Sequence, residues 1–503
     1  MSVAHRRPGF WPLGRVANAE RGSRMVGLPT DETLIVYVAG KTRWGKTELA
    51  KNAFLHMVHV ERHGALFVDP AADAVVRLKS FLTAPEALGR VTELGLHTDR
   101  QPGWNPLSMA GLGRDAVAGK VNAFGNAIAA VQGWSTKANS RAYNLAVQAA
   151  QALIELGLLL PEDLQPTIFQ IPRLLTDDAW REEVLKFLPE GLQGFWRNEF
   201  TGIAREAVPP VTHLIHTMRL SDALTALLGR SESTFDARRA MDQGRIVLLC
   251  PGTGSHEGRV LANLLVYDVV RALFGRADIP PEERLPFWLF LDELQTYDGA
   301  ISGRITDLLE GTCKFGGRTF ALNQEPERLA ADTLLSLLAN LSQLITTAVS
   351  PDSAKALMKG RSGAPAPETI AGLPKYQYVV DAWMGRRYGR PAPFQVEGVP
   401  TDQLWAAHHH PERVEVLDRM IDRQTKRRTA AQVREHLNTL EERILHALRN
   451  RGRRTSRGRA SSDDRGGSSG HVLPLRPPSP SDGPAADDVD EAPDSGLKEE
   501  SDD

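Results

Sequence analysis

A glycine-rich loop between an apolar segment and a helix-like segment constrains this chain more than any other feature. Residues Leu34 to Asn52 read LIVYVAGKTRWGKTELAKN, which contains the phosphate-binding pattern G-x-x-x-x-G-K-T. Leu34–Val38 is rich in branched and aromatic side chains, as in a buried strand, and a helix pattern begins at Glu48. This order of strand, loop and helix predicts an α/β fold that binds a nucleoside triphosphate.

The residue types of the loop suit ATP with Mg²⁺. Gly40 and Gly45 allow successive backbone N–H groups to point at one phosphate chain. Lys46 is expected to reach the β- and γ-phosphates, and the Thr47 hydroxyl to hold Mg²⁺. The helix that follows presents its positive N-terminal end to the anion. The predicted nucleotide-binding residues are Gly40, Lys41, Thr42, Arg43, Trp44, Gly45, Lys46, Thr47 and Glu48.

A second apolar segment delivers two carboxylates. Leu285–Tyr297 reads LPFWLFLDELQTY, in which a buried-strand pattern ends at Asp292 and Glu293. Asp292 is placed to bind the Mg²⁺ shell, as a strand-borne aspartate does in P-loop nucleotide hydrolases. Glu293 points differently, because it is the next residue, and can polarise an attacking water as a catalytic base. The pair favours hydrolysis over phosphoryl transfer to a second metabolite, although Asp-Glu also opens ordinary loops.

A third strand pattern ends in two amides. Arg318–Pro326 reads RTFALNQEP, and its apolar part is followed by Asn323 and Gln324. An amide at this place can sense the γ-phosphate, much as an amide orients water in other nucleotide hydrolases. We favour Gln324 as this catalytic group, while a solvated turn explains either amide equally well. Asp69, at the end of GALFVDP, is either a further ligand or a turn residue.

Apolar segments recur with helical patterns between them, which predicts an α/β sheet with helices on both faces. Tyr376–Trp383 and Pro393–Val396 alternate in polarity and predict a hairpin that closes the core. No strand pattern interrupts residues 115–230, where Arg141–Gly157 has the apolar spacing of a helix. We interpret 115–230 as an inserted all-α domain; the alternative is that its helices only line the sheet. The predicted strands are Leu34–Ala39, Gly64–Val68, Arg245–Cys250, Leu285–Leu291, Thr319–Leu322 and Leu344–Ala348.

The insertion divides the nucleotide-binding domain between residues 31–114 and 231–400. Residues 1–30 are predicted to be irregular. Residues 401–450 are predicted to form C-terminal helices, among them an amphipathic helix over Ala430–Leu448. Residues 451–503 are rich in Arg, Ser, Gly, Pro and acidic residues, first basic and then acidic. They have almost nothing to bury and are predicted to be a disordered tail.

Composition indicates the class of protein and the cellular compartment to expect. Its 503 residues, 42% hydrophobic and 24% charged, are ordinary for a globular protein and sufficient for more than one domain. Cys250 and Cys313 are far apart in sequence and suggest a reducing compartment rather than a disulfide framework. No apolar run approaches the roughly 20 residues that cross a bilayer. We expect a cytoplasmic protein without its own transmembrane segment, membrane-associated only through a partner.

Two polar features give weaker indications of ligands. His408, His409 and His410 look like a metal cluster, but adjacent residues cannot readily converge on one ion. In the insertion, Lys and Arg residues accompany Trp134 and Trp196, which are the types that contact phosphates and stack on bases. A solvated surface over a tryptophan-containing core explains them at least as well. The Arg-rich start of the tail is the better candidate for non-specific DNA attraction.

The order of these segments resembles that of the type IV secretion coupling ATPases. GKTRWGKT is followed by GALFVDP and WNPL (Trp104–Leu107), then by the helical insertion, GRIVLLCPG, LFLDELQ, ALNQEPERL and PDSAKAL. The resemblance is to the TraG/TraD conjugative DNA-transfer group of the HerA/FtsK superfamily of P-loop motors, and it looks closest to actinobacterial members. It spans roughly Leu34 to Val396, and the order is more specific than any single motif.

The resemblance implies a RecA-like ATPase that assembles as a homo-oligomer, a hexameric ring with ATP between its subunits. It implies that the ring pumps DNA through a central pore during conjugation, with relaxase or secretion-channel proteins as partners. The site residues that it implies are Gly40, Gly45, Lys46 and Thr47 for ATP and Mg²⁺, Asp292 for the metal shell, Glu293 for water activation and Gln324 for sensing.

The sequence also departs from that group. Arg43 and Trp44 stand where the group usually carries small residues, and Gly311–Lys314 offers no arginine finger to assign. The N-terminal membrane helices usual in coupling proteins have no counterpart in this sequence. Two other functions therefore stay open. One is a nucleotide-dependent adaptor that recruits protein substrates to a secretion machine, and the other is a HerA-like DNA-processing motor.

Overall fold

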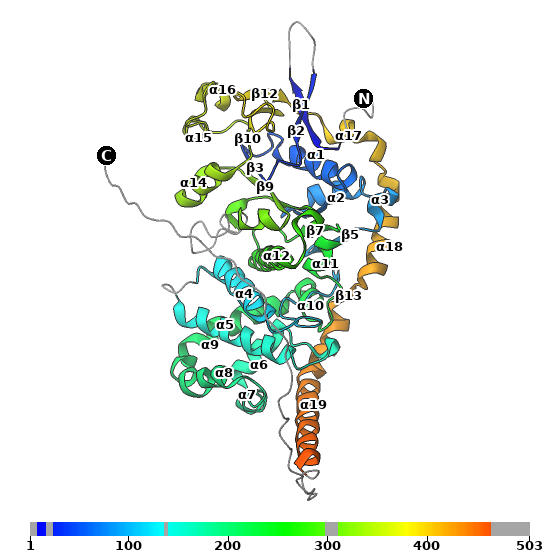
Figure 1. Cartoon of the computed structure of the whole chain (residues 1–503), viewed down its shortest axis with the longest axis vertical. Helices are drawn as coiled ribbons and strands as arrows, with labels where there is room; N and C mark the ends of the chain where they lie inside the picture. Colours follow the sequence, from blue (N-terminus) through cyan, green and yellow to red (C-terminus); the bar gives the residue numbers. More distant parts are fainter. Residues whose placement is uncertain (1–7, 17–23, 135–138, 297–309, 464–503) are drawn as a thin grey trace, which may run out of the picture. The chain divides into compact units, whose positions relative to one another are not determined.

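The computed structural model describes residues 8–16, 24–134, 139–296 and 310–463 (Figure 1). Residues up to Asn450 belong to one compact unit, and residues from Arg451 onwards to a second. The fold and the sites below lie in the first unit. Among the described helices, none combines the length and the apolar character needed to cross a bilayer.

An 11-stranded sheet organises the first unit, with the strand order β2-β1-β12-β11-β10-β3-β9-β8-β4-β7-β5. Neighbouring strands are parallel from β10 to β5 and antiparallel from β10 to β2. A second, two-stranded sheet pairs β6 with β13. The strands are β1 (Phe10–Val16), β2 (Arg24–Pro29), β3 (Ile35–Ala39), β4 (Gly64–Val68), β5 (Val91–Gly95), β6 (Arg100–Gln101), β7 (Ile246–Cys250), β8 (Phe287–Leu291), β9 (Gly317–Asn323), β10 (Gln343–Thr346), β11 (Gln377–Ala382), β12 (Phe394–Glu397) and β13 (Arg428–Thr429).

Helices cover both faces of the sheet, as the sequence predicts. In β3, Ile35 and Tyr37 point into one hydrophobic core and Val36 and Val38 into the other, because successive side chains of a strand face opposite ways. Helices α1 (Lys46–His59), α2 (Asp73–Lys79) and α18 (Val414–Thr425) contribute to the second core. Helices α12 (His256–Phe274), α14 (Ala331–Asn340) and α15 (Pro351–Leu357) contribute to the first. Both faces of β3 are therefore dry, which explains its continuously apolar sequence.

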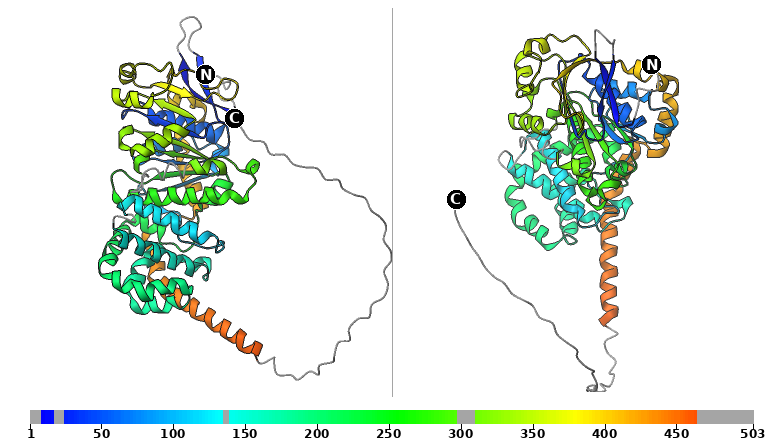
Figure 2. Two further views of the ribbon diagram at one scale, coloured as in Figure 1. Left: turned by 60° about the vertical axis from the view of Figure 1, so that its left-hand side comes forward. Right: turned by 45° about the horizontal axis from the view of Figure 1, so that its top comes forward.

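The helices extend over most of the remaining chain (Figures 1 and 2). They are α1 (Lys46–His59), α2 (Asp73–Lys79), α3 (Pro85–Leu88), α4 (Ala116–Gln132), α5 (Ser140–Gly157), α6 (Ile171–Thr176), α7 (Asp178–Leu185), α8 (Glu190–Gly194), α9 (Phe200–Leu220), α10 (Asp222–Leu228), α11 (Ala237–Asp242), α12 (His256–Phe274), α14 (Ala331–Asn340), α15 (Pro351–Leu357), α16 (Pro367–Ala371), α17 (Thr401–Leu404), α18 (Val414–Thr425) and α19 (Ala430–Asp463).

The strands predicted from apolar segments are confirmed as β3, β4, β7, β8, β9 and β10, and the predicted hairpin as β11 and β12. Helices alone occupy the described part of 115–230, and the prediction for Arg141–Gly157 is confirmed as α5. These helices pack on the sheet through α4, which lies against α12 (Figure 1). Their core is continuous with that of the sheet. The insertion is thus an all-α layer within one compact unit.

The structure differs from the sequence analysis in three places. Residues 10–16 and 24–29 are not irregular but form the antiparallel strands β1 and β2, which Pro12 and Gly14 conceal in the sequence. Strand β5 is not among the predicted strands, because Glu93 at its centre interrupts the apolar pattern. Helix α19 continues to Asp463 and so includes residues 451–463, the first part of the segment predicted as a tail; arginine is a good helix former. The rest of that tail lies outside the described residues.

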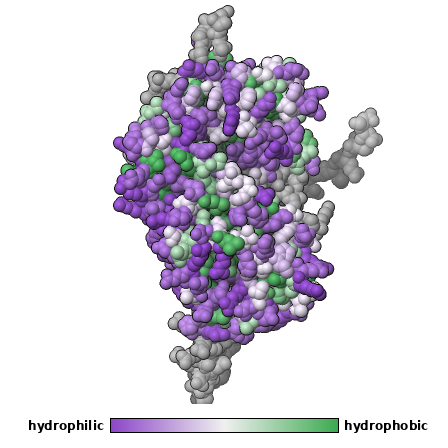
Figure 3. All heavy atoms as spheres, turned by 180° about the vertical axis from the view of Figure 1, so that it is seen from behind, coloured by the Kyte–Doolittle hydropathy of each residue, from purple (hydrophilic) through white to green (hydrophobic). Residues whose placement is uncertain are grey.

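Most hydrophobic side chains are gathered in the two cores. On the face shown in Figure 3, hydrophilic residues predominate and hydrophobic residues form small patches between them. The amphipathic helix predicted over Ala430–Leu448 is confirmed as part of α19. Its apolar residues, from Val433 to Leu448, join the core of the all-α layer. The helix is held in place by this buried stripe.

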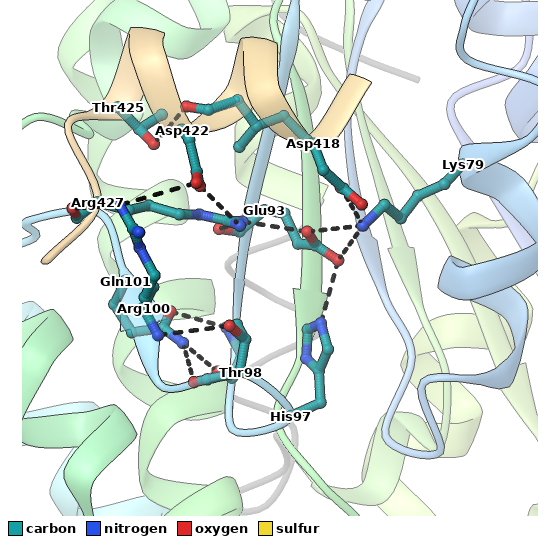
Figure 4. A network of polar contacts seen from close by, with 12 residues as sticks. Lys79, Glu93, His97, Thr98, Arg100, Gln101, Asp418, Asp422, Thr425 and Arg427 are labelled. Carbon is teal, nitrogen blue, oxygen red and sulfur yellow. Dashed lines mark hydrogen bonds and ion pairs between the residues drawn. The ribbon is translucent and has the colours of Figure 1, made fainter. Parts of the chain in front are cut away.

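A buried glutamate joins the C-terminal segment to the edge strand β5 (Figure 4). Glu93, only 2% exposed, accepts bonds from Lys79 Nζ, His97 Nε2 and Arg427 Nη2, each at 3.1 Å. Arg427 follows α18, and Lys79 also contacts Asp418 of α18 at 2.5 Å. Burial opposes ionisation, but the hydrogen bond from His97 and the charges of Lys79 and Arg427 hold the pKa of Glu93 well below its ordinary value. The carboxylate neutralises two cations, Lys79 and Arg427, from segments that are far apart in sequence.

We expect Glu93→Gln to lower the free energy of unfolding by about 3–5 kcal/mol at pH 7, because the buried Arg427 loses the closer of its two counter-charges and keeps only Asp422. A depressed folded-state pKa stabilises the protein above the unfolded-state pKa of about 4.3, and this contribution is lost as the pH falls towards the folded-state value. The difference between variant and wild type should therefore shrink below about pH 4. Urea titrations at several pH values measure it.

The exposed Glu435 of α19 provides a matched control, since Glu435→Gln removes the same charge from the surface. We expect this control to stay within about 0.5 kcal/mol of wild type. Equal urea midpoints for Glu93→Gln and wild type at pH 7 would contradict a stabilising role for the network.

Candidate nucleotide-binding site

The predicted site residues meet at one edge of the sheet. Strands β3, β9 and β8 are parallel neighbours, so the loops that follow their carboxyl ends lie side by side. These loops carry the glycine-rich segment, Gln324, and the pair Asp292 and Glu293. Between them is a cavity of about 500 Å³. It is lined by Thr42, Arg43, Gly45, Lys46, Thr47, Glu48, Asp292, Glu293, Gln324, Lys375 and Tyr376.

Both glycine positions of the loop exclude larger residues, because atoms of neighbouring segments lie too close for a Cβ. A Cβ on Gly40 would lie 1.8 Å from Thr347 Oγ1, at the end of the neighbouring strand β10. A Cβ on Gly45 would lie 2.7 Å from the ring of Tyr376, and the φ of 104° at Gly45 disfavours other residues. Gly45 is also the N-cap of α1, so the first turn of this helix opens onto the cavity. This backbone suits a phosphate chain.

Lys46 is the buried cation of the site, with 6% of the residue exposed. Its Nζ donates to the carbonyl oxygens of Gly40 at 2.6 Å and Lys41 at 3.1 Å, so the amine is held over the loop. Burial lowers the pKa of Lys46, while the negative charges of Asp292 and Glu293 oppose that shift. The two carboxylates and the lysine therefore share one electrostatic environment, as the sequence predicts.

Asp292 follows β8 and is oriented by a short turn. Its Oδ1 accepts the backbone N–H of Glu293 at 3.0 Å. Burial, followed by repulsion from Glu293, raises the pKa of Asp292 to about 6, and Lys46 counteracts part of this shift. Such a carboxylate gains from a cation beside it, because the cation offsets both causes of the raised pKa. Asp292 therefore fits the role of a Mg²⁺-shell group.

Glu293 turns out of the strand in a conformation that few residues adopt. Its φ is 55°, in the left-handed region, which costs a non-glycine residue free energy and is concentrated at functional sites. Gln295 Nε2 donates to its Oε2 at 2.6 Å, and Gln324 Nε2 donates to its Oε1. The carboxylate is therefore held at the cavity by two amides.

Gln324 connects the two halves of the site. While its Nε2 donates to Glu293, its Oε1 accepts the hydroxyl of Thr42 at 2.7 Å. Asn323, the other amide considered, is fully buried at the end of β9 and does not line the cavity. The geometry favours Gln324, because only this amide touches both the glycine-rich loop and Glu293. A change at the loop would reach Glu293 through it.

The structure also shows what Trp44 does. Its indole Nε1 donates to the carbonyl of Leu373 at 3.0 Å, and its backbone carbonyl accepts the N–H of Tyr376 at 3.1 Å. Lys41 and Lys375 lie over its ring, with Nζ 5.8 and 5.6 Å from the centroid. The side chains of Trp44 and Lys41 are not part of the cavity lining. Trp44 instead fixes the segment before β11 against the loop.

Lys375 and Tyr376 line the cavity but have no signal in the sequence. They lie more than 300 positions after the glycine-rich loop. Strand β11 runs antiparallel to β10, which is parallel to β3, so the start of β11 meets the carboxyl end of β3. Only this pairing places the two residues at the site. Their place at the cavity therefore follows from the antiparallel pairing of β11 with β10, which no local pattern in the sequence indicates.

Four other predicted residues have structural roles. Glu48 lines the cavity, and its Oε1 also accepts the backbone N–H of Thr401 at 2.7 Å. Asp69 accepts the N–H groups of Ala74 and Val75 at 2.7 and 3.0 Å, so it is the turn residue of the two alternatives. Trp134 and Trp196 are buried, with 5% and 3% exposed, so they are core residues rather than stacking platforms.

Solved structures share this fold. The bacterial conjugative coupling protein TrwBΔN70 in an unbound form is 17% identical, with a TM-score of 0.56 over 74% of this chain and 86% of that chain. TrwB in complex with ADP and Mg²⁺ is 18% identical, with a TM-score of 0.55 over 75% and 88%. VirB4 of Thermoanaerobacter pseudethanolicus is 13% identical, with a TM-score of 0.51 over 79% and 98%.

The likeness to these structures confirms the predicted fold class of a P-loop α/β sheet with many helices. It agrees with the resemblance found in the order of sequence motifs. No protein-family model matches the chain. No curated protein sequence matches it significantly either.

Proposed function

We propose that this protein is an ATP-hydrolysing motor of conjugative DNA transfer. The observation that carries the proposal is the meeting of Lys46, Asp292 and Glu293 at one cavity, on a fold shared with conjugative coupling proteins. A cationic loop and two carboxylates are the parts that a P-loop hydrolase needs. The likeness to nucleotide-bound TrwB structures supports ATP and Mg²⁺ as the ligands.

The residues divide the work of hydrolysis among them. The backbone of the glycine-rich loop and Lys46 hold the β- and γ-phosphates, and Thr47 and Asp292 would hold Mg²⁺, which neutralises charge on the phosphates. Glu293 orients a water and accepts its proton as the water oxygen bonds to the γ-phosphorus and the bond to the β-phosphate breaks. Gln324, bonded to both Thr42 and Glu293, responds to the γ-phosphate.

DNA as the substrate, a homo-oligomeric ring and a cytoplasmic setting belong to the same proposal. DNA stimulation and the ring are supported by the resemblance in motif order and by the shared fold. We propose a hexamer with nucleotide at the subunit interfaces, and relaxase or secretion-channel proteins as partners.

The proposal is tested by the ATPase activity of the purified full chain with and without DNA. We expect both hydrolysis of Mg-ATP and a rate that rises with single- or double-stranded DNA, and a stimulation that falls as salt is added, because phosphate contacts release counterions. Heparin, a polyanion without bases, controls for charge alone. The mass in solution reports the assembly. Hydrolysis that no DNA alters would overturn the motor proposal and favour a nucleotide-dependent adaptor.

A further inference from the structure

We propose that the protein binds a divalent transition-metal ion, with Zn²⁺ as the first candidate, between His59, Glu86 and His408. One ligand atom from each of these residues lies within 4.8 Å of the other two. His59 ends α1, Glu86 lies in α3, and His408 ends the 3₁₀ helix η10 (Ala406–His408) of the C-terminal segment. The cluster is separate from the nucleotide cavity, and none of its residues lines that cavity.

His59, the histidine from α1, has the burial and the tautomer that suit a metal ligand. Its side chain is 1% exposed, and its Nε2 lies 2.9 Å from the carbonyl oxygen of Phe81. Since a carbonyl oxygen can only accept, Nε2 carries the hydrogen, and the lone pair of the neutral ring is on Nδ1. This Nδ1 is buried without a hydrogen-bond partner. A second ring nitrogen bonded to a backbone carbonyl is the usual arrangement of a metal-binding histidine.

The neighbours of that nitrogen are electron-rich. Glu86 Oε1 lies 3.6 Å from His59 Nδ1 and 3.9 Å from His408 Nε2, distances too long for hydrogen bonds. The rings of His59 and His408 are close, with centroids 4.6 Å apart. Burial, followed by the adjacent His408, lowers the pKa of His59 to about 4. The lone pair of His59 Nδ1 and the carboxylate of Glu86 face each other, and a cation between them would interact favourably with both.

The donor set and spacing fit Zn²⁺. Two imidazoles and one carboxylate form a known zinc set, with bonds of about 2.0–2.2 Å. Tetrahedral bonds of that length place neighbouring ligand atoms roughly 3.3–3.6 Å apart. The 3.6 and 3.9 Å separations from the Glu86 oxygen are close to this range. The ligand nitrogens of His59 and His408, which lie within 4.8 Å of each other, would move closer together around the ion. Glu86 and His408 have 31% and 23% of their side chains exposed, which leaves an entry path for the ion.

The adjacent histidines do not join the cluster, in agreement with the expectation that three neighbours cannot converge on one ion. The ring of His409 stacks on Phe81, with centroids 4.6 Å apart. His410 Nδ1 lies 3.3 Å from Glu412. His408 alone turns towards His59. The ion would fasten the C-terminal segment to the far end of α1, whose first residue is Lys46 of the phosphate-binding loop.

The experiment is a calorimetric titration of the chelator-treated full chain with ZnCl₂, in excess Mg²⁺ so that the nucleotide site does not take up zinc. We expect the wild type to bind one equivalent that His408→Ala and Glu86→Gln lose, or bind at least about 10–100-fold more weakly. His410→Ala, a neighbouring histidine outside the cluster, should keep it. The partly exposed positions allow the variants to fold, and their melting temperatures without metal should match that of wild type.

Co²⁺ provides a second measurement, because tetrahedral Co²⁺ absorbs visible light far more strongly than the aqua ion. Wild type should show this absorption, and His408→Ala should lack it. The proposal is overturned if wild type does not bind the equivalent of Zn²⁺, or if His408→Ala and Glu86→Gln bind it as tightly as wild type. Neither result depends on ATPase activity, so this test is independent of the proposed function.

Discussion

Glu293→Gln should slow ATP hydrolysis by about 10²–10⁴-fold while leaving nucleotide binding close to that of wild type. The substitution keeps the size of the side chain but removes the carboxylate that would accept a proton from water. Its partners, Gln295 and Gln324, are amides that can donate or accept, so they can adjust to an amide at this position. Phosphate release measures turnover, and a fluorescent ATP analogue measures binding.

Glu325→Gln is the matched control for Glu293→Gln. Glu325 is an exposed carboxylate directly after Gln324, and it pairs with Arg328 at 2.9 Å on the surface. It lies near the site but is not part of the cavity lining. We expect its turnover to equal that of wild type. Full activity in Glu293→Gln would reject the catalytic role of this carboxylate, whereas loss of nucleotide binding would point to a structural one.

Lys46→Ala should lower Mg²⁺-dependent ATP turnover by at least about 10²–10³-fold, because the substitution deletes the buried cation that would contact the phosphates. The amine also bonds to the carbonyls of Gly40 and Lys41, so the variant tests the loop as well as the charge. Lys46→Met keeps the apolar stem and separates these effects. We expect Lys46→Met to be as inactive as Lys46→Ala, with a melting temperature nearer to that of wild type.

Lys355→Ala removes an exposed lysine from α15 and should leave the turnover unchanged. Unlike Glu293→Gln, the Lys46 variants should also bind ATP more weakly. Turnover at the wild-type rate in Lys46→Ala would refute the assignment of the phosphate-binding loop. The two sets of variants therefore separate binding of the phosphates from activation of water.

Local pattern was sufficient for the parallel core and for most of the site. Buried parallel strands are apolar along their whole length, so β3, β8 and β9 stand out from their surroundings, and the polar residues that follow them are visible at once. The opposite holds for β1 and β5. Pro12 and Gly14 interrupt the apolar pattern of β1, and Glu93 interrupts that of β5. The buried charge of Glu93 is tolerated because distant residues neutralise it.

The glycine-rich loop, the carboxylates at the end of β8 and the amide at the end of β9 could be recognised from the chain alone, because each depends on residues close together in sequence. Lys375 and Tyr376 at the cavity, the Thr42–Gln324–Glu293 connection and the cluster of His59, Glu86 and His408 arise from segments that are far apart in sequence. Strand order and helix docking determine these contacts. No local periodicity encodes which distant side chains will share a buried space, since that depends on the packing of the whole unit.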